Sequence, residues 1–172
     1  MVTEFAQGEL FDVGQDGLDR LALSMGGNSV MPIASQVLQA YLQDQDWRKR
    51  HAVMIALAQI AEGCQKLMLK QGISSTTDIC VRCIQDPHPK VRWAACQAIG
   101  QLSTDLGPDL QLQEYARLVP ALLAAMDDAS PRVQAHATCA MVNFSEALDE
   151  EEEVLLDVWD SLTVTGDLES DY

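Results

Sequence analysis

Three stretches of the chain share one pattern of apolar and polar positions and follow one another at intervals of 42 residues. They begin at Asp44, Asp86 and Asp128 and align without a gap. In the middle copy the apolar positions follow the spacing i, i+3, i+4, i+7, i+8, i+11, which makes one stripe along an α-helix. These positions are Val91, Ala94, Ala95, Ala98, Ile99 and Leu102. The pattern predicts a helix in each copy, with alanines that allow a neighbouring helix to approach closely.

Each copy also opens with residues that favour the start of a helix. Asp44, Asp86 and Asp128 can accept hydrogen bonds from backbone N–H groups that are free at a helix start. Pro89 and Pro131 suit the first helical turn, where a missing N–H group has no cost. We therefore expect the helix of each copy to begin a few residues after its aspartate.

A second helical pattern precedes each copy. The expected helices span 31–43, 75–85 and 112–126. Pro32 is expected at the entry of the first, and Pro120 predicts a kink or a local break in the third. Residues 16–27 predict the second helix of an incomplete earlier unit, which Gly26 and Gly27 end.

Two helices in a unit of about 40–47 residues are typical of HEAT and armadillo repeats. Such units bury their apolar faces only against their neighbours. We therefore predict an all-α fold, a short right-handed α-solenoid of about three and a half units. The expected organisation is a flexible N-terminal extension (1–15), a HEAT-repeat domain (16–148) and an acidic C-terminal tail (149–172). The domain divides into a partial unit 16–30 and repeats 31–72, 73–111 and 112–148.

The charge of the chain is uneven. The net charge is −15, and residues 149–172 hold ten of the 26 acidic residues and no Lys or Arg. Acidity argues against binding to the nucleic-acid backbone and favours basic protein segments as partners. The tail is either a solvated end or an acidic–hydrophobic segment that competes with basic cargo or folds against the open last repeat. The second alternative rests on a helical stripe of Val154, Leu155, Val158 and Leu162, beside Trp159.

Candidate chemistry is sparse. Cys80 and Cys83 lack the second pair that a zinc site needs, and His136 and Cys139 lack an orienting third group. No glycine-rich phosphate loop occurs, so we expect no enzyme, no metal and no cofactor. Neither a run of about 18 apolar residues nor a secretory signal is recognisable. The five scattered cysteines fit reduced thiols in the cytoplasm or nucleus.

Four stretches resemble the importin-beta (karyopherin-beta) nuclear transport receptors, and in particular the importin beta-3 branch. They are GLDRLALSMGG (17–27), QDQDWRKRHAVMIALAQIAEGC (43–64), IQDPHPKVRWAACQAIGQLSTD (84–105) and PRVQAHATCAMVNFSE (131–146). The resemblance covers about residues 8–148. It implies a middle section of a receptor of about twenty repeats, without the amino-terminal region that binds the GTPase Ran. Basic cargo and, through a full-length receptor, Ran are the partners that it implies.

The second helices of a HEAT array line its concave face, so equal repeat positions form rows there. An amide row, the carboxylates one turn further on and a tryptophan two turns before make up the candidate site. The residues are Gln59, Gln101 and Asn143, then Glu62, Asp105 and Glu146, and Trp93. Amides can bind the backbone of an extended peptide. Carboxylates can hold Lys or Arg, and a tryptophan can lie against their side chains.

The resemblance implies that these rows bind lysine-rich import signals. Two alternatives stay open from the residues themselves. The rows can be the ordinary solvent face of the second helices, and the chain can be a HEAT scaffold that joins proteins, or a non-functional fragment, without cargo recognition.

Overall fold

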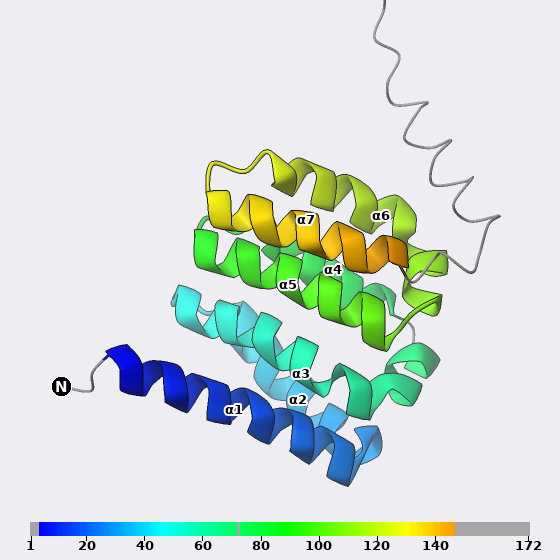
Figure 1. Cartoon of the computed structure of the whole chain (residues 1–172). Coiled ribbons are helices and arrows are strands. Elements are labelled where there is room, and N and C mark those ends of the chain that lie inside the picture. Colours follow the sequence, from blue (N-terminus) through cyan, green and yellow to red (C-terminus); the bar gives the residue numbers. More distant parts are fainter. Residues whose placement is uncertain (1–3, 72, 147–172) are drawn as a thin grey trace, which may run out of the picture.

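The computed structural model describes residues 4–71 and 73–146 and forms a solenoid of helices in two layers. Seven α-helices and no strands occur in these two ranges. Their bounds are α1 Glu4–Met25, α2 Gly27–Leu42, α3 Trp47–Gln71, α4 Ser74–Cys83, α5 Pro89–Asp105, α6 Asp109–Met126 and α7 Pro131–Glu146. Helices α1, α3, α5 and α7 stack in one layer, which we call the inner layer, and α2, α4 and α6 form the outer layer (Figure 1). The predicted all-α solenoid is confirmed.

The aspartates that open the three copies lie in the turns before the inner helices. The carboxylate of Asp86 accepts from the backbone N–H of His88 at 2.8 Å, and that of Asp128 accepts from Ser130 at 2.8 Å. Asp44 accepts from the N–H of Asp46 at 2.9 Å in the same way. Each aspartate therefore closes the turn two residues ahead, which directs the chain into the next inner helix.

Two arginines join successive repeats through these aspartates. Arg50 of α3 makes two hydrogen bonds with the Asp86 carboxylate, at 2.6 and 3.0 Å. Arg92 of α5 repeats the contact with Asp128, at 2.6 and 2.9 Å. Each arginine also donates to the backbone carbonyl of its own repeat's aspartate, Asp44 or Asp86. These Arg–Asp pairs are partly buried and bidentate, the geometry in which such a pair is strongest.

Small residues set the spacing of the inner layer. A Cβ atom on Gly63 of α3 would lie 2.3 Å from the carbonyl carbon of Ala22 in α1. At Gly100 of α5 it would lie 3.3 Å from the Cα of Ala140 in α7. The backbones of neighbouring inner helices therefore touch at these glycines, as the alanine-rich pattern predicted for the repeats.

The structure differs from the sequence-based expectation at the starts of α1 and α2, and it shows no local break at Pro120. Helix α1 begins at Glu4, so most of the stretch 1–15, expected as a flexible extension, is helical. Phe11 in this stretch lies near α3, with the ring centroids of Phe11 and His51 6.1 Å apart. Helix α2 begins at Gly27, so Pro32 stands inside it and not at its entry. Helix α6 runs unbroken past Pro120, whose exposed position leaves water free to bond the carbonyl that lacks its usual donor.

Helix α3 is the one described helix that is long and apolar enough to cross a membrane by length and composition. Half of that apolar stretch is buried inside the solenoid. Core helices of α-solenoids commonly have this composition because neighbours cover them on several sides.

Candidate functional site

A polar pocket of about 230 Å³ lies on the inner layer, and three successive repeats contribute to it. It is lined by Asp19 of α1, by Ala58, Gln59 and Glu62 of α3, and by Gln101 and Asp105 of α5. Three carboxylates and two amides thus face one space. Among the described residues, no Lys or Arg lines this acidic pocket.

Asp105 is the carboxylate of the acidic pocket whose orientation and pKa its neighbours determine. The side-chain amide of Gln101 donates to both oxygens of Asp105, at 3.0 and 3.1 Å. Burial raises the pKa of Asp105, the bond from Gln101 opposes this shift, and the negative charges of Glu62 and Asp19 add to the rise. The ionised form of Asp105 is therefore held at a cost, which a cation placed between the three carboxylates would offset.

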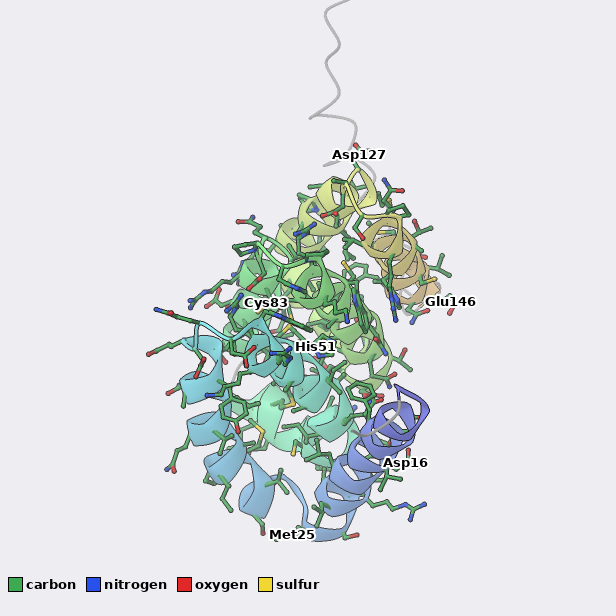
Figure 2. All side chains as sticks on the ribbon, turned by 90° about the vertical axis from the view of Figure 1, so that its left-hand side faces the viewer. Asp16, Met25, His51, Cys83, Asp127 and Glu146 are labelled. Atoms are coloured by element: carbon green, nitrogen blue, oxygen red, sulfur yellow. The ribbon has the colours of Figure 1, made fainter. Side chains whose placement is uncertain are left out.

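Four of the seven residues that the sequence predicted come together in the acidic pocket. They are Gln59, Glu62, Gln101 and Asp105. Asn143 is half-buried and donates to the backbone carbonyl of Gly100 at 3.4 Å, so its amide contacts the neighbouring inner helix. Glu146 is exposed at the end of α7 and lies on the same edge of the molecule as Asp16 of α1 (Figure 2). Neither Asn143 nor Glu146 lines the pocket.

Trp93 lies apart from the acidic pocket and is only 8% exposed. Its ring stacks on His136 with centroids 5.0 Å apart and meets the edge of His51 at 5.2 Å. The guanidinium of Arg132 lies 4.2 Å from the centroid of the indole. We expected an open ring that receives cations of a peptide, but the cation on this ring is the chain's own Arg132. The next repeat covers the tryptophan, a contact that the pattern of a single helix does not reveal.

Asp19 is the pocket residue that the sequence-based reasoning missed. It stands 43 residues before Glu62, which stands 43 residues before Asp105. The 42-residue interval, extended back from Glu62, reaches Arg20 and not Asp19. The repeat alignment therefore does not identify Asp19, and the packing of α1 on α3 brings it to the pocket.

The cysteines and histidines form no second site. Burial raises the pKa of the Cys80 thiol, and it raises that of Cys83 to about 11, so both stay protonated and unreactive near neutral pH. His136, three residues before the exposed Cys139, is stacked on Trp93. Within residues 4–71 and 73–146, no group of three His, Cys, Asp or Glu side chains could hold a metal ion.

Known proteins share this arrangement of repeats. The family model described as HEAT repeats matches residues 34–111 and 82–163. Importin subunit beta-3 of Saccharomyces cerevisiae is 39% identical over 137 residues, which are 79% of this chain and 12% of that protein. The chain therefore spans about one eighth of the length of this relative.

Two solved structures agree in fold. The structure of Kap121p bound to RanGTP has a TM-score of 0.77 and 36% identity, and the match covers 86% of this chain and 15% of that one. Kap121p bound to the SUMO protease Ulp1p has a TM-score of 0.79 and 34% identity, over 91% of this chain and 16% of that one. The resemblance to the importin-beta receptors is thus confirmed by sequence and by structure. The chain belongs to the HEAT-repeat family and is homologous to a segment of importin beta-3.

Proposed function

We propose that this chain is a cargo-binding segment of an importin-beta-like nuclear import receptor, and that its acidic pocket holds a lysine of a basic import signal. The observation that carries the proposal is the convergence of Asp19, Glu62 and Asp105, from three repeats, on one pocket that no described Lys or Arg lines. The likeness to importin beta-3 and to Kap121p bound to RanGTP and to Ulp1p supports a role in transport and not in catalysis. Such a segment works in both the cytoplasm and the nucleus.

The chemistry of the pocket suits an ammonium group. A lysine offers three N–H donors on a long apolar stem, and the pocket offers acceptors from three helices. Asp105 is already oriented by Gln101, so little side-chain freedom is lost when the cation enters. The amide of Gln59 stands at the edge of the same space and can bond the peptide backbone on either side of the lysine.

The first experiment titrates a fluorescent lysine-rich peptide into the full chain, beside the same peptide with alanines in place of its lysines. We expect binding of the lysine peptide alone, and weaker binding at physiological salt than at low salt, because exposed charges are screened. Glu62→Lys should raise the Kd at least about tenfold, which corresponds to about 1.4 kcal/mol.

Asp127→Lys is the matched control, since it makes the same change in charge at an exposed loop residue outside the pocket. It should leave the Kd within about twofold of the unaltered chain, because Asp127 lies in the turn before α7, whereas the pocket lies towards the carboxyl-terminal ends of α3 and α5. Equal losses in the two variants would show a response to total charge and would contradict the pocket. Absence of binding, with an unchanged helical circular dichroism spectrum, would favour the alternative of a HEAT scaffold without cargo recognition.

A further inference from the structure

The last two described helices present an apolar face on the side that points away from the preceding repeats. Arg117 of α6 bonds Asp78 and Ser74 of α4, so this side of α6 faces the preceding repeat. Leu112 and Leu123 lie about 120–140° around the helix from Arg117, at 3.6 residues per turn. They are 39% and 40% exposed.

The side of α7 that corresponds to the α7-facing side of α5 is exposed, whereas its counterpart in α5 is buried. Val142 occupies the repeat position of Gly100, which lies buried against Ala140 of the following inner helix. Val142 is 49% exposed, and no described residue takes the place on it that Ala140 takes on Gly100. Its neighbours repeat the contrast, since Thr138 and Ser145 are exposed where Cys96 and Ser103 of α5 are buried. Leu112, Leu123, Met141 and Val142 together form what we call the terminal face.

We propose that residues 152–163 of this same chain dock on the terminal face as a helix, in the place of the first helix of a further repeat. The chain continues for 26 residues beyond Glu146, and the HEAT-repeat match runs on to residue 163. Five residues, 147–151, separate α7 from this segment, and three residues, 106–108, separate α5 from α6. The segment therefore begins where the repeat spacing calls for a first helix.

The composition of the segment fits this place. Val154, Leu155, Val158 and Leu162 form one helical stripe, which can cover the exposed Leu112 and Leu123 of α6, itself the first helix of its repeat. Glu152 and Glu153 would lie in the first turn of the helix, where the helix dipole favours negative charge. The terminal face is itself neutral, so apolar burial supplies the attraction, and the acidic side chains stay in water.

The test measures hydrogen exchange by mass spectrometry on the full chain. We expect the amides of 152–163 to exchange at least about tenfold more slowly than in an unstructured peptide of the same sequence. Leu112→Gln together with Leu123→Gln should return them to the unstructured rate and leave exchange in α3 and α5 unchanged. Both residues are exposed in the described structure and the changes are neutral, so neither folding nor net charge should respond.

Ile33→Gln together with Val37→Gln is the matched control. These residues are 64% and 45% exposed on α2, at the other end of the solenoid, and the pair should leave exchange in 152–163 unaltered. Exchange at the unstructured rate in the unaltered chain would overturn the proposal, as would slow exchange that ignores the terminal-face variant. Slowing that grows with protein concentration would assign the contact to a second copy. A saturating lysine-rich peptide could instead speed up exchange in 152–163 while the terminal-face variant leaves that exchange unchanged. This result would place the segment at the acidic pocket.

Discussion

At the scale of single residues, the charge of Asp105 in the acidic pocket suits the proposed binding of a lysine but lowers the stability of the folded protein. Asp105 is half-buried, and Gln101 bonds it while two further carboxylates repel it. The bond from Gln101 stabilises the ionised form, but burial and the charges of Glu62 and Asp19 outweigh it and raise the pKa of Asp105. The proposed binding of a lysine would offset this repulsion.

This view predicts opposite effects for Asp105→Asn. The substitution should weaken binding of a lysine peptide and raise the melting temperature at pH 7. The direction follows from proton linkage, because the pKa of Asp105 is higher in the folded than in the unfolded protein. Such a carboxyl favours folding at a pH below its unfolded pKa, near 4. It loses this contribution as the pH rises through its folded pKa. Thermal melts at pH 7 and at pH 3.5 measure the effect, and the gain in melting temperature should shrink at the lower pH. A lower melting temperature at pH 7 would contradict the repulsion.

The Arg–Asp pairs give a second residue-scale prediction, with the opposite dependence on pH. Hydrogen bonds from Arg92 lower the pKa of Asp128, so the stability that this pair contributes is present above about pH 4 and is lost as the pH falls through the folded pKa. Arg92→Gln should reduce the free energy of unfolding at pH 7 by about 1.5–3 kcal/mol, since a partly buried carboxylate loses two charged bonds. Urea unfolding measures the loss.

Arg48→Gln is the control for that prediction, because Arg48 pairs with Asp46 at 3.7 Å and both side chains are largely exposed. An exposed pair of this kind contributes less than about 1 kcal/mol. Similar losses in the two variants would mean that the bidentate geometry does not matter.

At the scale of helices, close backbone contact and not side-chain size joins α1 to the rest of the solenoid. Gly63 allows this contact, because the carbonyl group of Ala22 fills the space where a Cβ atom would stand. Gly17 of α1, in contrast, has nothing within 4 Å of that position. A glycine-to-alanine substitution can therefore be compared at a crowded position, Gly63, and at an open one, Gly17.

Gly63→Ala should destabilise the protein by about 1–3 kcal/mol, because backbone must move to admit the methyl group. Gly17→Ala should stabilise it by up to about 1 kcal/mol through helix propensity. Urea unfolding of both variants checks the pair. Equal changes in the same direction would show that α1 is not packed on α3 as described.

Helix limits also show how far the sequence predicts this structure. The inner helices were predictable because an aspartate and, in two copies, a proline precede each stripe at equal spacing. The start of α1 was not, because residues 4–15 carry no clear apolar stripe, and the contact of Phe11 with His51 of α3 cannot be read from the pattern of one helix. Trp93 was misjudged for a related reason: its cover, Arg132 and His136, comes from the next repeat. Patterns within one helix predict helices, and contacts between repeats decide which side chains remain free.

At the scale of the whole molecule, each repeat is stabilised only by its neighbours. Helix α5 has a helix of the inner layer on both sides and contains ten buried residues. Helix α1 has an inner neighbour on one side only among the described residues, and several of its apolar side chains are exposed. Stability should therefore be graded along the solenoid.

Native-state hydrogen exchange should reveal this gradient. We expect the amides of α5 to be the slowest of the inner helices and those of α1 the fastest, with α3 and α7 between them. The order should be kept in low concentrations of urea, where partial unfolding from the ends dominates. Uniform exchange across all inner helices would instead show one cooperative unit.

The positions of the Arg–Asp pairs have a mechanical consequence for the acidic pocket. Arg50 and Arg92 join the repeats near the amino-terminal ends of α3 and α5, whereas Glu62 and Asp105 lie about three and a half turns further along. At 1.5 Å per residue, the pocket is about 20 Å from these fixed points. A rotation of about 5° between two repeats then changes the separation of the carboxylates by about 2 Å over that length. If a cation drew these carboxylates together, neighbouring inner helices would tilt towards each other at their carboxyl-terminal ends, about the fixed points at the ion pairs.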